Sequence, residues 1–141
     1  MGRLVNLESA GRERTRLTKA LVLAIRELVK QPEPNAEARD LAAFTVLVLE
    51  RIAETIEVSV AAWEKRNYWI KADKFREKWG WSHGYASRMS GALLDDDWAK
   101  IAEIVAKIGE RLNNIEVSDK HRLGQPWIGA WYEFKARPPK R

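Results

Sequence analysis

Residues 35–65, NAEARDLAAFTVLVLERIAETIEVSVAAWEK, predict one long helix near the middle of the fold. Apolar side chains recur along this stretch at helical spacing and form one stripe: Leu41, Phe44, Val48, Ile52 and Ile56. Val46, Leu47 and Leu49 extend that stripe onto the other faces. Asn35 is suited to cap the helix, because its side chain can accept a hydrogen bond from a free backbone N–H group. A helix that is apolar on several faces lies inside a bundle, so we expect other helices to surround this one.

Two further long helices are predicted, one before this stretch and one after it. The first covers about residues 12–30 and ends before Pro32 and Pro34, because a proline disfavours helix in the residue before it. The second follows residues 95–97, three aspartates whose charge suits a helix start. Its apolar residues repeat with nearly coiled-coil spacing: Trp98, Ile101, Val105, Ile108, Leu112 and Ile115.

The helical pattern is interrupted between these two long stretches. It weakens at Arg66 and Asn67, which predicts a kink or a new helix, and it resumes through about residue 79. We expect a turn over residues 80–84 and a short helix over about 85–94. The whole pattern predicts an all-α fold in one domain, residues 1–141: a bundle of three long helices with a short helical insert, about 70–94.

The end of the chain, residues 118–141, is predicted to be an irregular basic tail that is either docked or flexible. It carries Trp127 and Trp131 among glycines and prolines. A tail that stays ordered must bury apolar surface, and we expect the two indoles to pack against the Trp-rich segment 63–81. Exposed indoles that stack on bases or bind a protein partner are the alternatives.

Composition excludes several kinds of site. The 141 residues include no cysteine, so a disulfide, a thiolate nucleophile and a Cys-ligated metal are excluded. The longest strongly apolar run, Leu41 to Leu49, is far shorter than the roughly 20 residues that cross a bilayer. The N-terminus also lacks the residue order of a signal peptide. We therefore expect a cytoplasmic protein that has no membrane segment.

Aromatic residues and positive charge coincide along the chain. Eleven of the thirteen Trp, Tyr and Phe residues fall within residues 63–88 and 127–134. The net charge is +5, and its basic surplus lies in residues 1–35, 63–94 and 118–141, of which the last two carry these aromatic residues. Such a mixture can stack bases and neutralise phosphates. A dense secondary core under an evenly solvated surface would give the same pattern.

Residues 75–89, FREKWGWSHGYASRM, resemble a helix-turn-helix element. In that motif a glycine makes the turn and a Ser or Thr caps the recognition helix, which are the positions of Gly80 and Ser82 here. The resemblance implies that His83, Gly84, Ser87 and Arg88 face the major groove, with Arg88 suited to a guanine. A plain corner between two helices is the structural alternative.

The acidic residues favour structural roles over metal binding. Glu50, Glu54 and Glu57 share one side of the central helix, where we expect them to pair with the basic first helix. Neither His83 nor His121 completes a Glu-x-x-His pair, so a two-metal site is not supported. No spacing suggests a nucleophile with its base. We predict no metal, no cofactor and no catalytic residues, and a binding protein rather than an enzyme.

The leading hypothesis is a basic nucleic-acid-binding helical module with its surface around residues 63–88. Its predicted contact residues are Lys71, Lys74, Arg76, Lys78, Ser82, His83, Ser87 and Arg88, and its stacking or interface residues are Trp69, Trp79, Trp81, Trp127 and Trp131. The alternative is a protein-binding or assembly subunit, such as a homo-oligomer, with the tryptophans as interface anchors. A third hypothesis is a bundle that binds a small molecule, or an enzyme, with a pocket lined by Trp63, Trp69 and Trp98.

Overall fold

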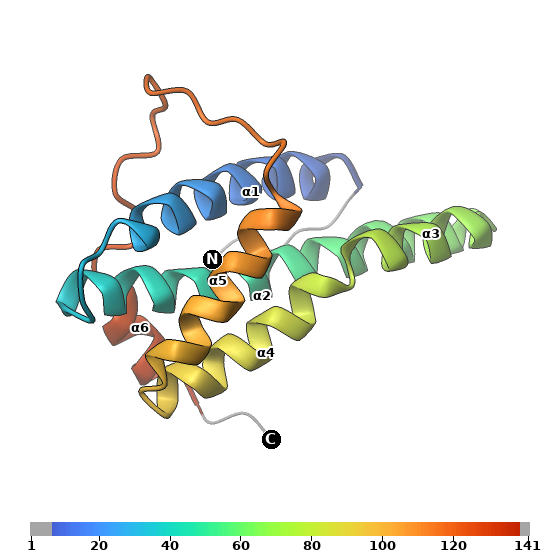
Figure 1. Cartoon of the computed structure of the whole chain (residues 1–141). Helices are drawn as coiled ribbons and strands as arrows, with labels where there is room; N and C mark the ends of the chain where they lie inside the picture. Colours follow the sequence, from blue (N-terminus) through green and yellow to red (C-terminus); the bar gives the residue numbers. More distant parts are fainter. Residues whose placement is uncertain (1–6, 139–141) are drawn as a thin grey trace.

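A computed structural model describes residues 7–138 of the chain, and in that range it contains helices and no strand (Figure 1). The helices are α1 (Leu7–Val29), α2 (Ala36–Lys65), α3 (Trp69–Trp79), α4 (Trp81–Leu94), α5 (Trp98–Arg111) and α6 (Ala130–Ala136). The predicted all-α fold class, a bundle with a helical insert and a tail, is confirmed.

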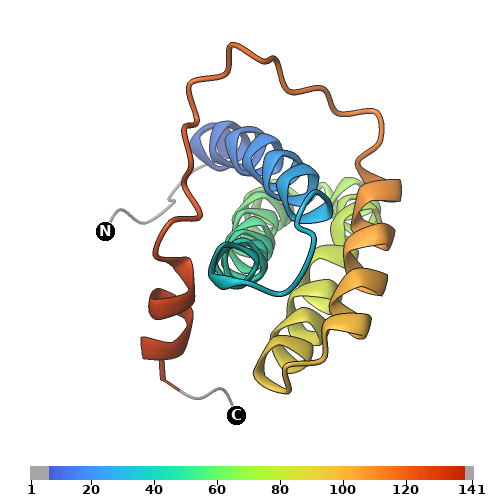
Figure 2. The ribbon, with the colours of Figure 1, turned by 60° about the vertical axis from the view of Figure 1, so that its left-hand side comes forward.

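Helix α2 lies at the centre of the molecule, as its sequence predicts. It contacts α1, α3, α4 and α6, which surround it when the molecule is viewed along its axis (Figure 2). Leu41, Val46, Leu49 and Ile52 are fully buried although they point to different sides of the helix. The predicted cap is also present, because the Asn35 side chain accepts a hydrogen bond of 2.8 Å from the Ala38 backbone N–H.

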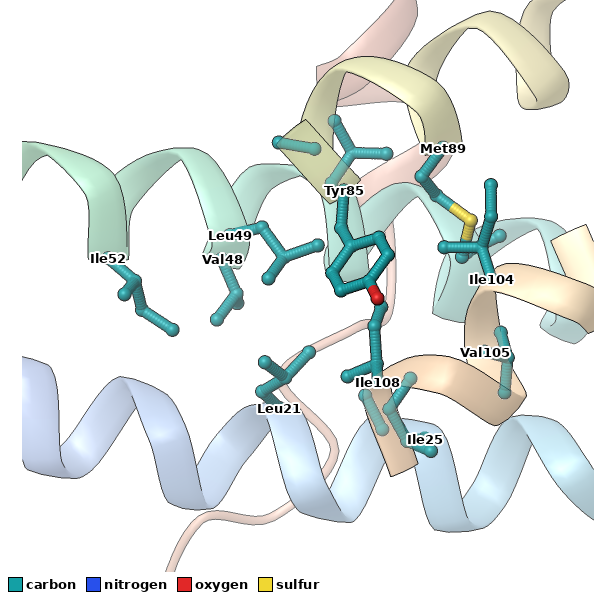
Figure 3. Close-up of a cluster of buried hydrophobic side chains, with 14 of the residues drawn as sticks. Leu21, Ile25, Val48, Leu49, Ile52, Tyr85, Met89, Ile104, Val105 and Ile108 are labelled. Carbon is teal, nitrogen blue, oxygen red and sulfur yellow. The ribbon is translucent and has the colours of Figure 1, made fainter. Parts of the chain in front are cut away.

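Side chains of four helices meet in the part of the core that Figure 3 shows in close-up. Side chains of α1, α2, α4 and α5 meet there, among them Leu21, Leu49, Tyr85, Met89 and Ile108. Burial of these apolar groups is the main favourable contribution to folding. Helix α4 is therefore part of the central core, although the sequence assigned it to a short insert.

The turn predicted over residues 80–84 is wrong. Helix α4 begins at Trp81, and Gly80 has helical backbone angles, φ −58° and ψ −25°. Glycine lowers helix propensity by about 1 kcal/mol per residue, but Tyr85 and Met89 bury their side chains in the core only if this segment stays helical. Packing therefore outweighs the local signal from Gly80 and Gly84.

The end of the chain packs on α2, on the side away from α4 and α5 (Figure 2). After α5 the chain crosses over α1 and then forms α6, whose Ala130 and Phe134 are buried together with Trp127. The expectation that Trp127 and Trp131 pack against segment 63–81 is wrong. Residues 127–136 pack instead on α2. The sequence pattern of α2 is apolar on several faces, and one of these faces receives α6.

Candidate nucleic-acid interface

A tight turn between α2 and α3 places apolar side chains at the outer end of a helical hairpin. Asn67 has φ 63°, a left-handed conformation that asparagine tolerates better than most residues. The Tyr68 N–H donates a hydrogen bond of 2.9 Å to the Trp63 carbonyl and closes the turn. Tyr68, Trp69 and Ile70 follow directly, and their exposed fractions are 53%, 55% and 74%. The turn therefore presents three large apolar residues to solvent.

These residues form one side of an open groove with a volume of about 990 Å³. We call it the tip groove, and its lining is Trp63, Asn67, Tyr68, Trp69, Ile70, Lys71, Lys74, Phe75 and Lys78. Its floor is aromatic, because Trp63 of α2 and Phe75 of α3 meet edge to face with ring centroids 4.7 Å apart. That contact holds the two helices of the hairpin together beneath the groove.

The tip groove carries positive charge without a neutralising carboxylate. Lys71, Lys74 and Lys78 line it, and among the residues that the structure describes no aspartate or glutamate does. Lys71 places its Nζ 4.7 Å from the centroid of the Trp63 ring, and among the described residues none of the three lysines forms an ion pair. Three of the predicted contact residues therefore lie together, beside the predicted stacking residue Trp69.

Arg14 of α1 supports the inner end of the groove. Its guanidinium lies 4.7 Å from the centroid of Phe75 and donates hydrogen bonds to the Thr55 carbonyl, the Thr55 hydroxyl and the Ser59 hydroxyl. All of these partners are neutral, and burial lowers the pKa of Arg14 from its usual value. Arg14 is thus a partly buried cation that forms no ion pair with a carboxylate among residues 7–138.

Two of the predicted contact residues have partners within the protein: Arg76, which is exposed, and Ser82, which is buried. Arg76 forms ion pairs with Glu64 of α2 at 3.0 Å and with Asp73 at 3.5 Å, and it does not line the groove. Ser82 is buried, and its hydroxyl donates a hydrogen bond of 2.8 Å to the Trp79 carbonyl. Its predicted role as a helix cap that contacts nucleic acid is wrong, because the hydroxyl faces the interior.

The helix-turn-helix interpretation is wrong for the same segment. That motif sets its two helices at about 90–120° to each other, whereas α4 continues from α3 in nearly the same direction, across the single residue Gly80 (Figure 1). His83, Ser87 and Arg88 are exposed on α4, outside the tip groove. Arg88 lies over the Tyr85 ring, 4.6 Å from its centroid.

The predicted tryptophans differ in what they can contact. Trp79 and Trp81 are half-buried and stack on each other with centroids 6.0 Å apart. Trp131 of α6 is half-buried between Arg39 of α2 and Lys135 of its own helix. Trp127 is buried, so its prediction as a stacking or interface residue is wrong.

The third hypothesis grouped three tryptophans that the structure separates. Trp63 and Trp69 line the tip groove, whereas Trp98 lines a different hollow between α5 and the α1–α2 connection.

Two residues of the tip groove, Tyr68 and Ile70, were not predicted from the sequence as site residues. The signal for them was Asn67, an asparagine at the break in the helical pattern, which marks a turn that exposes whatever follows it.

Two glutamates of the acidic face of α2 form ion pairs other than the expected ones with α1, and Glu54 pairs with Arg51 of its own helix. Glu50 forms an ion pair with Arg137, which follows α6. An ion pair that joins α1 to α2 has the acid, Glu13, on α1 and the base, Arg51, on α2. Within residues 7–138 no group of three or more histidine, aspartate or glutamate side chains has a geometry suited to a metal ion. In the same range no helix has the length and apolar character needed to span a membrane.

No protein-family model matches this chain, and no curated protein and no solved structure matches it.

Proposed function

We propose that this protein binds nucleic acid through the tip groove. The observation that carries the proposal is the lining of that groove, where Lys71, Lys74 and Lys78 stand beside exposed Trp69 and Tyr68 without any carboxylate. Lysines that approach phosphates release condensed counterions, which supplies affinity for any sequence. Exposed aromatic rings add stacking on bases, which is also tolerant of sequence.

The charge around the groove supports the same function. Asp73 and Glu77 belong to the same helix but lie outside the lining, and Asp73 is paired with Arg76. The acidic residues of the hairpin are thus directed away from the groove, and its lysines keep their full attraction for a polyanion. A site for a neutral or cationic partner gains nothing from this arrangement.

The test is a salt series of fluorescence-anisotropy titrations with labelled duplex DNA, single-stranded DNA and RNA. We expect binding whose log K falls linearly with log salt concentration. Replacing Lys71, Lys74 and Lys78 together with alanine should reduce the slope of that line by about 2 to 3, because each phosphate contact contributes about 0.7 to 0.9.

The matched control removes three exposed lysines elsewhere: Lys30, Lys100 and Lys107. They lie outside the groove, so the slope should stay that of the unchanged protein. If no nucleic acid binds even at low salt, where such contacts are strongest, the proposal is wrong. A protein partner for the exposed apolar residues Trp69 and Ile70 then becomes the better hypothesis.

A further inference from the structure

The tip groove is continued by two smaller hollows along α1. The first, which we call the Arg14 hollow, lies between α1 and the end of α3, has a volume of about 220 Å³, and is lined by Arg14, Lys19 and Trp79 among others. It lies next to the tip groove, because the Arg14 guanidinium lies 4.7 Å from the ring centroid of Phe75, which lines that groove, and 5.9 Å from that of Trp79, which lines the hollow. The centroids of the Phe75 and Trp79 rings themselves lie 6.4 Å apart. The aromatic floor thus extends from the groove into the hollow.

The second hollow, which we call the loop hollow, has a volume of about 380 Å³ and lies between α1 and residues 116–123. It shares Thr15 and Lys19 with the Arg14 hollow, so the two are contiguous. The segment that covers it is held in a turn by the Leu123 N–H, which donates to His121 Nδ1 at 3.2 Å. This turn brings Arg122 into the lining, opposite α1.

Positive charge persists along the whole path. Arg12 and Arg16 line the loop hollow but pair with Glu8 and Glu13 of their own helix. Lys19 and Arg122 form no ion pair among residues 7–138. The lining of the loop hollow includes one carboxylate, Glu116, against four basic side chains. An elongated polyanion therefore meets attractive charge from the tip groove to the loop hollow.

We infer that the ligand is a single strand of nucleic acid that runs from the tip groove, past Arg14 and Trp79, to Lys19 and Arg122. This inference rests on the proposed function and names its substrate class. The bases of a duplex are already stacked on each other, whereas a single strand can place an unstacked base on an exposed ring such as Trp69. The path also passes neutral and aromatic surface between the cations, as in other proteins that hold single strands.

The experiment compares oligothymidylates of about 4 and about 16 nucleotides, which bracket the usual site sizes of single-strand binding folds. We expect the longer strand to bind more tightly because it reaches both ends of the path. In the variant Lys19→Ala with Arg122→Ala, the gain from lengthening should fall, and the salt slope for the long strand should decrease by about 1.4. The short strand should bind this variant as it binds the unchanged protein.

Two further variants separate the contributions. Trp69→Ala should weaken both strands by about 5- to 150-fold without changing the salt slope, because stacking involves no counterion release. Lys100→Ala with Lys107→Ala removes the same charge from α5, outside the path, and should keep the full gain from lengthening. Thermal unfolding of each variant checks that the fold is intact.

The outcomes distinguish the inference from the proposed function. If the double substitution of Lys19 and Arg122 with alanine changes neither the affinity nor the salt slope for the long strand, the inferred path is wrong. The tip groove then remains the proposed binding site. If a duplex binds more tightly than a single strand of the same sequence, the substrate class is wrong. If no nucleic acid binds at low salt, the proposed function itself fails, and the inference with it.

Discussion

Asp40 of α2 caps helix α6, which begins ninety residues later in the chain, at Ala130. Its carboxylate accepts a hydrogen bond of 2.9 Å from the Trp131 N–H and another of 3.2 Å from the Gly129 N–H. Helix α6 has no capping side chain of its own, because Gly129 occupies the cap position. The free N–H groups at its start therefore depend on a carboxylate from another helix.

Replacing Asp40 with alanine should loosen the end of the chain. We expect a loss of about 1 kcal/mol in the free energy of unfolding, the usual cost of a lost helix cap, together with faster proteolysis within residues 112–129. Urea unfolding and limited proteolysis measure the two effects. Asp95→Ala is the control, because Asp95 is exposed and its side chain forms no hydrogen bond among the described residues. Equal effects of the two substitutions would contradict the capping role.

Trp127 should tolerate phenylalanine better than its burial suggests. Its indole N–H is buried and has no hydrogen-bond partner among the described residues, which costs about 1 to 3 kcal/mol. Trp127→Phe removes that cost along with some apolar area, so we expect a change in stability of less than about 1 kcal/mol. Trp127→Ala should cost about 3 to 5 kcal/mol through the cavity that it leaves. Chemical denaturation of both variants makes the comparison, and similar losses would show that the N–H is satisfied.

Two glycines should respond to alanine in opposite directions. Gly91 lies within α4, and a Cβ atom added there would meet nothing within 4 Å. Alanine should therefore stabilise the protein by about 0.5 to 1 kcal/mol. Gly129 has φ 85°, where an added Cβ costs about 1 to 2 kcal/mol. Differential scanning calorimetry should show a higher melting temperature for the first variant and a lower one for the second, and the same sign for both would overturn the argument.

The exposed face of α4 should be dispensable for nucleic-acid binding. His83, Ser87 and Arg88 lie outside the tip groove and outside its continuation along α1. We expect the triple alanine variant to keep the affinity and salt slope of the unchanged protein in anisotropy titrations. A marked loss for duplex DNA would instead restore major-groove recognition by this helix.

Helix positions followed from the sequence where local signals and packing agree. The periodicity of α2 predicted both its length and its central place, and Asn35 and Asp97 cap helices as expected. The turn at residues 80–84 was predicted wrongly because the low helix propensity of glycine is a local signal, whereas the burial of Tyr85 and Met89 depends on α2 and α5.

The site was predictable to a similar degree. Lys71, Lys74 and Lys78 follow helical spacing, so their common face was visible in the sequence, and the structure brings them together with Trp69. The engagement of Arg76 was not visible, because its partner Glu64 lies on α2. Ser82 and Trp127 were assigned to the surface for the same reason, since burial depends on which segment covers a residue and not on its type.

The two attachments of α6 have a consequence for the order in which the protein folds. Asp40 and Glu50 hold its two ends, through contacts between residues 87 to 91 positions apart in the chain. Contacts of such separation form only after the long intervening segment has closed, at an entropic cost that neighbouring helices do not bear. The pairing of α1 with α2 can precede this step. We therefore expect docking of α6 to be a late event in folding, and its release to be an early local opening of the native protein.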